Sequence, residues 1–279
     1  MSGKLYVVAT PIGNLEDITI RALNVLKSVA LIACEDTRHT AKLLKHYEIS
    51  TPTISYHEHN EKERALQILG RLEQGDSVAL VSDAGTPLLS DPGHVIVCLA
   101  IEAGFKIEPV PGASALLAGL VASGLPLHDF FFCGFLPARA SQRRRRLRQL
   151  LDIGTTLVFY EAPHRIREAL QDLSQVCPDI TLVVARELTK LHEEFLRGTP
   201  TELLEKLTFP RGEFVILLDS RQLDSSQATV ISDNKSIKSR VEALQMQGLD
   251  RMDAIKQVAK KLGISKSEAY RRLQEELSQ

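Results

Sequence analysis

Three short segments of the sequence gather side chains that can exchange protons or bind phosphate. They read CEDTRHT, YEAPHR and ARELTKLHEE, and they begin at Cys34, Tyr160 and Ala185. Each segment follows an apolar run that predicts a strand. A histidine can be neutral at neutral pH and accept a proton, whereas an arginine stays protonated and can form bidentate hydrogen bonds to phosphate oxygens. The candidates for the chemical step are Glu35, His39, Glu161, His164, Glu187 and Lys190, and those for phosphate contact are Arg38 and Arg165.

Four loops that follow predicted strands join proline or glycine turns to small side chains. They are Thr10–Leu15, Ser82–Gly93, Val110–Ala115 and Tyr160–Arg165. Small residues let backbone N–H and C=O groups approach a ligand closely. The phosphate motif GxGxxG is absent, and the first three loops contain no lysine or arginine of the kind expected for a triphosphate. The sequence therefore predicts a polar cleft for a zwitterionic, nucleoside-like ligand, with Asp83 as the carboxylate at one strand end.

Apolar runs alternate with helical patterns along most of the chain. This alternation predicts an α/β fold with mostly parallel sheets, which bind ligands beyond the carboxyl ends of their strands. The expected strands are Leu5–Ala9, Leu31–Cys34, Thr53–Ser55, Ser77–Val81, Lys106–Val110, Phe130–Phe135, Thr156–Tyr160, Ile180–Ala185 and Glu213–Leu218. The expected helices include Ile20–Ser28, Glu61–Gln74, His94–Ala103, Ala115–Ala122, Ser141–Leu151, Ile166–Gln175 and Pro200–Lys206.

Shifts in composition divide the chain of 279 residues into four expected parts. That length suits about two domains. A segment rich in small residues near 112–126 and a polar one near 220–235 mark the boundaries. The parts are an N-terminal αβ domain (1–114), a second αβ domain (115–220), a linker (221–235) and a small helical domain (236–279). Ser114 is placed to cap the helix that opens the second domain.

Overall composition argues against several classes of protein. Lys plus Arg (34) nearly equals Asp plus Glu (35), so any affinity for nucleic acid must come from local patches. The cysteines Cys34, Cys98, Cys133 and Cys177 have no zinc-like spacing and predict buried thiols without a metal site. The most apolar stretch, Gly112 to Leu127, is shorter than the roughly 20 residues that a bilayer needs. With no visible signal peptide, a soluble cytoplasmic protein is expected.

Taken together, the strand-end segments resemble one family of methyltransferases. The chain is similar to the tetrapyrrole methylase superfamily, whose members use S-adenosylmethionine. It most resembles the branch of small-subunit ribosomal RNA 2′-O-methyltransferases that modify a cytidine ribose. The segments that carry the resemblance are ATPIGNLEDIT (Ala9–Thr19), CEDTRHTAKLL (Cys34–Leu44), SDAGTPLLSDPG (Ser82–Gly93), VPGASA (Val110–Ala115), GFLP (Gly134–Pro137), YEAPHRI (Tyr160–Ile166) and ARELTKLHEE (Ala185–Glu194).

The resemblance implies a fold of the class III methyltransferase type, with two αβ domains, the methyl donor between them, and a homodimer. It also implies that the substrate is 16S ribosomal RNA, which we expect to be presented by the assembled 30S subunit. The turn Thr10–Leu15 is then a floor of the cleft rather than a phosphate cradle. The donor-binding residues that it implies are Pro11, Gly13, Asp83, Gly85, Thr86, Ser114, Ala115 and Tyr160.

Two basic segments are candidates for contact with RNA. Ser141–Leu151 places arginines beside a helical apolar stripe, which suits either a solvated face or a phosphate-binding ridge. The tail segment Asp253–Leu273 has a helix–turn–helix pattern, with Gly263 at the turn, Ser265 as cap and Tyr270 among the packing residues. Besides Arg38 and Arg165, the expected RNA contacts are Arg143, Arg144, Arg145, Arg146, Lys266, Arg271 and Arg272.

Several alternatives stay open at this point. The charged strand ends could be salt bridges between parts of the structure, so no single base is identified. The tail could be a packing or dimerisation unit. Two other functions compete with RNA methylation: C-methylation of a corrin or porphyrin precursor, and regulation by a non-enzymatic helix–turn–helix protein. A small tetrapyrrole needs neither the arginine run nor the basic tail, and a regulator would bind duplex DNA without turnover.

Overall fold

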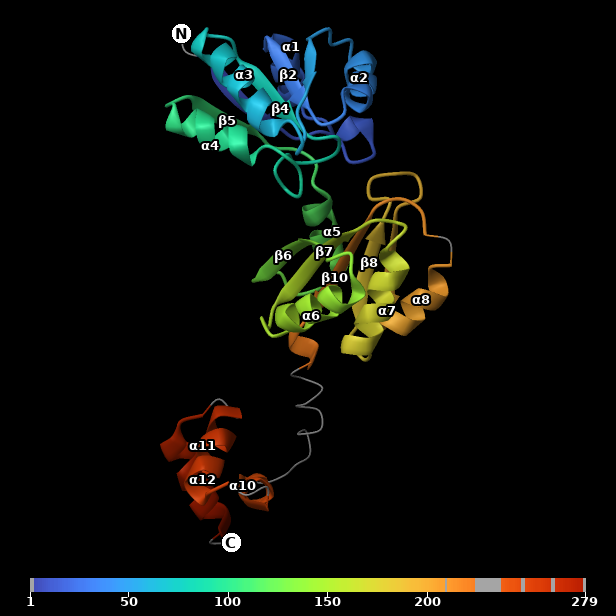
Figure 1. The fold of residues 1–279 in the computed structure, drawn as a ribbon. Coiled ribbons are helices and arrows are strands. Elements are labelled where there is room, and N and C mark those ends of the chain that lie inside the picture. The colour runs from blue at the N-terminus through green and yellow to red at the C-terminus, as the bar shows by residue number, and fades with distance from the viewer. Residues whose placement is uncertain (1–2, 209, 224–236, 247–248, 262–263, 278–279) are drawn as a thin grey trace. The chain divides into compact units, whose positions relative to one another are not determined.

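The computed structural model describes residues 3–208, 210–223, 237–246, 249–261 and 264–277. The chain divides into two compact units, Met1–Arg221 and Gln222–Gln279, and the larger unit contains two β-sheets (Figure 1). Within the described residues, no helix is both long enough and apolar enough to cross a membrane.

The first sheet contains five strands in the order β3-β2-β4-β1-β5, all of them parallel to their neighbours. Helices cover both faces, so β2 and β4 are buried along their whole length. One core cluster includes Val8 and Leu26, and the opposite one includes Leu5, Ile68 and Ile96. The elements are β1 (Lys4–Val8), η1 (Leu15–Asp17), α1 (Ile20–Ser28), β2 (Leu31–Cys34), α2 (Thr37–His46), β3 (Thr53–Ser55), α3 (Glu61–Glu73), β4 (Val78–Val81), α4 (His94–Glu102) and β5 (Lys106–Val110).

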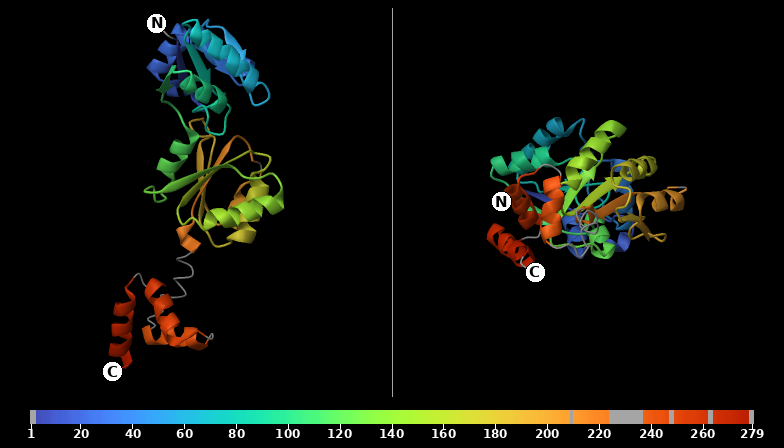
Figure 2. Two further views of the ribbon diagram at one scale, coloured as in Figure 1. Left: turned by 60° about the vertical axis from the view of Figure 1, so that its left-hand side comes forward. Right: turned by 90° about the horizontal axis from the view of Figure 1, so that it is seen from below.

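The second sheet has the order β6-β7-β10-β8-β9. Helix α5 lies against one face, and α6 and α7 lie against the other (Figure 2). The elements are α5 (Ala115–Ser123), β6 (Phe130–Phe135), α6 (Ala140–Leu151), β7 (Thr156–Glu161), α7 (Ile166–Val176), β8 (Leu182–Arg186), β9 (Glu194–Gly198), α8 (Pro200–Lys206) and β10 (Phe214–Asp219).

Strand direction in the second sheet differs from the prediction of mostly parallel sheets. Only β6 and β7 run parallel among its described pairs, while β10 is antiparallel to both β7 and β8, and β9 is antiparallel to β8. The segment 187–193 joins β8 to β9 directly, and a parallel crossover needs a dozen or more residues. The α/β prediction is confirmed, and its parallel part holds for the first sheet.

Helix α2 and strand β9 were absent from the predicted list, as was the short helix η1. Helix α2 follows β2 within the charged segment, and Asp36 caps it by accepting a hydrogen bond from Arg38 N at 2.8 Å. Strand β9 has a partly exposed pattern, because it lies at the edge of the sheet. Its alternation of charged, apolar and glycine residues is too weak to identify a strand by periodicity.

The second unit contains three described helices, α10 (Ile237–Met246), α11 (Arg251–Lys261) and α12 (Lys266–Leu277). Their core includes Ala254, Val258 and Leu273, as the helix–turn–helix pattern predicts. Ser265 Oγ accepts a hydrogen bond from Glu268 N at 3.1 Å, which confirms the predicted cap. Tyr270 is 45% exposed, so the prediction that it packs in the core is wrong. The predicted turn at 263 and most of the predicted linker lie outside the described residues.

Candidate active site

The first strand-end loop is fixed to the loop that follows β4. Thr10 N donates to Gly85 O at 2.9 Å, and Gly85 N donates back to Thr10 O at 3.1 Å. Gly85 has φ +85°, a conformation that favours glycine. The Thr10 hydroxyl also donates to Ser82 O at 3.1 Å. These bonds make the two loops one continuous floor at the carboxyl edge of the first sheet.

The third loop connects this floor to the second sheet. Thr86 Oγ1 donates to Ala113 O at 3.3 Å, and the hydroxyl of Tyr160 accepts a hydrogen bond from Leu116 N at 3.0 Å. Ser114 occupies the N-cap position of α5, but its side chain accepts no capping hydrogen bond from the described helix amides. The predicted cap is therefore corrected: Tyr160, at the end of β7, satisfies an amide at the start of α5.

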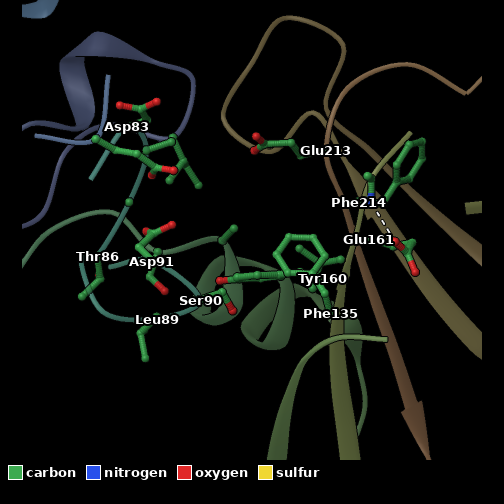
Figure 3. A pocket seen from close by; sticks show the side chains of 18 of the residues that line it. Asp83, Thr86, Leu89, Ser90, Asp91, Phe135, Tyr160, Glu161, Glu213 and Phe214 are labelled. Carbon is green, nitrogen blue, oxygen red and sulfur yellow. Dashed lines mark hydrogen bonds between the residues drawn. The ribbon is translucent and has the colours of Figure 1, made fainter. Parts of the chain in front are cut away.

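A pocket of about 380 Å³ opens beside these loops. Figure 3 shows Asp83 and Asp91 on one side of it, with Tyr160 and Glu213 on the other. Six of the eight residues that the family resemblance implied for the donor line this first pocket: Asp83, Gly85, Thr86, Ser114, Ala115 and Tyr160.

Carboxylates dominate the polar lining of the first pocket. Glu35, Asp83, Asp91, Glu161 and Glu213 line it, and its described lining includes no lysine, arginine or histidine. Burial, reinforced by the charge of Glu35, raises the pKa of Asp91 to about 6. Burial and the charge of Asp83 raise the pKa of Glu35. The ionised carboxylates repel one another, so the pocket suits a ligand with positive charge.

Two of these carboxylates were not among the predicted site residues. Asp91 lies in the quoted segment SDAGTPLLSDPG, so its position after β4 was a usable signal. Glu213 directly precedes β10, and a parallel strand would place it at the opposite edge of the sheet. The antiparallel register pairs Phe214 with Glu161 and Arg186, which brings Glu213 beside the ends of β7 and β8.

A second pocket of similar volume adjoins the first. The predicted donor residues Pro11 and Gly13 line this second pocket and not the first. His39, Lys42 and Lys190 also line it. The two pockets share Ile12, Asp83, Ala84 and Glu213, which form a common wall.

The remaining candidates from YEAPHR occupy different environments. The Glu161 carboxylate is buried and lies 3.4 Å from Arg165 Nε, and in Figure 3 it points away from Asp83 and Asp91. Burial raises the pKa of Glu161. Arg165 also donates to Leu136 O, which fixes the start of the loop between β6 and α6. His164 is exposed and lines neither of the described pockets.

The arginine run does not present a uniform basic ridge. Arg143 is 2% exposed, and its Nε lies 2.6 Å from Asp172 Oδ2. Arg144 lies 2.9 Å from Asp172 Oδ1 and is half-buried. Arg145 and Arg146 are exposed. The prediction of RNA contact is corrected for Arg143, because a buried guanidinium paired with a carboxylate cannot reach an RNA phosphate.

Arg38 and the predicted RNA contacts of the second unit lie at the surface, and several are paired with acids. Arg38 is exposed and bonds Asp36 at 2.8 Å. In the second unit, Arg271 and Arg272 both bond the carboxylate of Glu268, and Lys266 is exposed.

The candidates for the chemical step in the loop after β8 form an ion pair, in which Lys190 Nζ lies 2.8 Å from Glu187 Oε1. Among the residues described, no cluster of three or more His, Cys, Asp or Glu could hold a metal ion.

Comparison with known proteins identifies the family. The family model described as Tetrapyrrole (Corrin/Porphyrin) Methylases matches residues 4–204, well over half of the chain. The chain belongs to the tetrapyrrole methylase family. It is accordingly a methyltransferase, and the two pockets lie within the unit that contains the matched residues.

Relatives within the family cover nearly the whole chain. A protein of Halalkalibacterium halodurans named "Ribosomal RNA small subunit methyltransferase I" is 43% identical over 270 residues, which are 96% of this chain and 93% of that protein. A Bacillus subtilis protein of the same name is 42% identical over 271 residues, 96% of this chain and 93% of that protein. A Vibrio cholerae protein of that name is 50% identical over 220 residues, 77% of this chain and 76% of that protein.

Solved structures show the same fold at lower identity. Diphthine synthase matches with a TM-score of 0.64 and 16% identity, over 77% of this chain and 90% of that one. A uroporphyrin-III C-methyltransferase of Thermus thermophilus, solved with S-adenosylhomocysteine, matches with a TM-score of 0.56 and 21% identity, over 79% of this chain and 100% of that one. These likenesses confirm the tetrapyrrole methylase fold.

Proposed function

We propose that this methyltransferase transfers a methyl group from S-adenosylmethionine to the 2′-oxygen of a cytidine ribose in 16S ribosomal RNA. The observation that carries the proposal is the extent of the match to proteins named as small-subunit ribosomal RNA methyltransferases. Identity of 43% extends over 96% of the chain, so it includes residues from both units. We further propose that the cytoplasmic, assembled 30S subunit is the substrate, because folded RNA can present a single-stranded target.

The first pocket fits S-adenosylmethionine in size and charge. Its volume of about 380 Å³ lies in the range of small-molecule sites. The donor carries a sulfonium and an ammonium against one carboxylate, so its net charge is positive. Asp83, Asp91 and Glu213 would attract that charge, Ile12 and Val215 provide apolar contact, and the backbone of the fused loops can approach closely. When bound, the donor supplies an electrophilic methyl carbon.

The residues of the chain then have to align the acceptor oxygen with that methyl carbon. The bonds between Thr10 and Gly85 fix the wall between the pockets, which supports catalysis by proximity. A ribose hydroxyl is a weak acid, so removal of its proton assists the transfer. His39 lines the second pocket and His164 lines neither, so we propose His39 as the proton acceptor. Glu161 and Arg165 are then positioning residues for the loop that follows β6.

We also propose that the protein is a homodimer. The edge strand β6 exposes Phe130 and Phe131, and the outer side of α5 exposes Leu117 (53%) and Val121 (73%). A second copy of the chain is the proposed partner for these apolar side chains.

The proposed boundary between two αβ domains lies between residues 114 and 115. It is supported by helix α5, which starts at Ala115 and packs against the second sheet through Leu116.

The proposal is tested by transfer of a labelled methyl group from S-adenosylmethionine to small ribosomal subunits from a strain that lacks this protein. Naked RNA and a tetrapyrrole precursor serve as competing substrates, and digestion of the RNA locates the modified nucleoside. A 2′-O-methylcytidine formed on subunits is expected. Label in the tetrapyrrole alone would assign a small-molecule C-methyltransferase. Tight binding of duplex DNA without any turnover would assign a regulator.

A further inference from the structure

The two adjoining pockets differ in the sign of their charged lining. The first has carboxylates, and its described lining contains no cationic side chain. The second is lined by Lys42 and Lys190, together with His39. Asp83 and Glu213 line both pockets, as part of the shared wall. Among the residues that line only the second pocket, the lysines carry the permanent charge. A cation-lined pocket beside an acid-lined one suits an anionic molecule.

Lys190 is held in place rather than free in solvent. Its Nζ lies 2.8 Å from Glu187 Oε1, and its side chain is 36% exposed. A Cβ on Gly13 would collide with Lys190 Cγ, so the absence of a side chain there lets Lys190 lie across the first strand-end loop. A Cβ on Gly212 would collide with the Glu187 carboxylate. Two glycines from distant parts of the sequence therefore make room for one ion pair.

The loop that carries Lys190 is strained and docked. Glu187 and Thr189 have φ values of +52° and +66°, which are uncommon for residues with a side chain. The loop is fastened by Asn14 N, which donates to Thr189 Oγ1 at 3.0 Å, and by Leu188, which packs in the same core cluster as Ile12. Backbone strain of this kind persists where the surroundings over-determine it, and it concentrates at functional sites. The strained residues thus directly precede Lys190, which lines the second pocket.

We propose that Lys190 and Lys42 bind a backbone phosphate of the acceptor RNA in the second pocket. The acceptor ribose then lies at the wall formed by Ile12 and Asp83, across from the methyl donor. Lys42 comes from α2 and Lys190 from the loop after β8, so the phosphate is held between elements of both sheets. This inference rests on the proposed function and adds to it the side chains that hold the acceptor strand.

The test compares Lys190→Gln and Lys42→Gln with Lys45→Gln, a matched control. Lys45 is exposed on the same helix as Lys42 and lines neither described pocket. For each variant, methylation of small subunits gives KM and kcat over a range of salt concentrations, and calorimetry gives the Kd for S-adenosylmethionine. Neither lysine is buried, and Lys42 is a surface residue, so Lys42→Gln leaves the fold intact even if the Glu187 pair matters for stability.

Each of the two pocket variants is expected to raise KM for subunits about tenfold, the scale for one lost charge-assisted hydrogen bond. The slope of log affinity against log salt should fall by about 0.7 for each lost contact, as for single-stranded RNA. The donor Kd and the Lys45→Gln variant should match the wild type. A weakened donor Kd with an unchanged KM would overturn the inference, as would no change in any variant. No transfer to subunits by the wild-type protein would instead overturn the proposed function itself.

Discussion

Arg143 and Asp172 form a buried ion pair between α6 and α7, with Arg143 Nε 2.6 Å from Asp172 Oδ2. The same guanidinium donates to the carbonyl oxygen of Ala138 at 3.1 Å and to Glu168 at 3.2 Å. One arginine of the run that was predicted to contact RNA therefore anchors the loop between β6 and α6. Phe135, the last residue of β6 before that loop, lines the first pocket.

Removing Arg143 should destabilise the protein rather than weaken RNA binding alone. The change Arg143→Ala leaves Asp172, whose side chain is 5% exposed, without its closest cation. Breaking a buried pair in this way typically costs about 3–5 kcal/mol. Urea denaturation should show that the free energy of unfolding falls by about 3 kcal/mol, the lower end of this range, because Arg144 still bonds Asp172. The exposed Arg145→Ala should leave the unfolding midpoint unchanged. A stable Arg143→Ala protein with weakened subunit binding would contradict this account.

A side chain at Gly13 should impair use of the acceptor more than binding of the donor. In Gly13→Ala the new Cβ meets Lys190 Cγ and lies 3.0 Å from Leu188 O, and Gly13 lines the second pocket. Displacement of Lys190 should raise KM for subunits about tenfold, the scale for one charge-assisted hydrogen bond, with little change in donor Kd. Gly70→Ala is the control, because a Cβ there meets nothing within 4 Å in a helix and should be neutral or stabilising. A change in the donor Kd without a change in KM for subunits would contradict this account and would assign Gly13 to the donor site, as the family resemblance implied.

Asp91 should make donor binding and stability respond to pH in opposite directions. Its pKa of about 6 is above the usual value of about 3.9, so the folded protein holds the proton more tightly than the unfolded chain does. This group therefore costs stability progressively as the pH rises from about 4 to about 6. Asp91→Asn should raise the Tm relative to the wild type at pH 7.5, because Asp91 is ionised about 1.5 pH units above its pKa. The gain should vanish near pH 4.

The same ionisation should favour the cationic donor. Wild-type affinity for S-adenosylmethionine should increase as the pH rises through about 6, because a positive ligand binds the ionised carboxylate better. Asp91→Asn should weaken binding above that pH and flatten the profile, as measured by calorimetry across pH. A donor affinity that is equally pH-dependent in the variant would assign the titration to Glu35, whose pKa is also raised by burial.

Loss of the Tyr160 hydroxyl should loosen the start of α5. In the wild-type protein, Leu116 N donates to the Tyr160 hydroxyl at 3.0 Å, and Tyr160→Phe removes this acceptor. The expected loss of stability is about 1 kcal/mol, typical of one intramolecular hydrogen bond. Donor affinity should also fall, since Ser114 and Ala115 line the first pocket at this helix start. Equal denaturation curves and equal donor Kd values for wild type and variant would show that the hydroxyl positions nothing.

Much of the fold could be predicted from apolar runs that end in glycine or proline turns, but strand direction could not. Every strand of the first sheet lies within a residue or two of its predicted bounds, because each is a short apolar or β-branched run separated from the next by a helix, and β2 and β4 are buried along their whole length. In the second sheet the direction of β10 depends on long-range pairing with β7 and β8, which leaves no local signal. Glu213 was missed for that reason alone.

Individual roles within the site were harder to predict than its location. The strand-end loops were expected to meet, and they do, through bonds such as Thr10 N to Gly85 O at 2.9 Å. Arg143 precedes Leu147 by four residues and so lies on the apolar face of α6, which was a usable signal in the sequence. Its partner Asp172 belongs to α7, and that pairing leaves no local signal. That Ile12 lines both pockets while Gly13 lines only the second likewise depends on how the loop after β8 packs against the first strand-end loop.

The acid-lined first pocket also bears on how the enzyme would turn over. Transfer of the methyl group removes the sulfonium charge, so the spent donor is electrically neutral overall while the fresh donor is positive. Carboxylates such as Asp83 and Asp91 would hold the fresh form more strongly than the spent one. The lining that recruits the substrate would thereby promote departure of the by-product and limit inhibition by it.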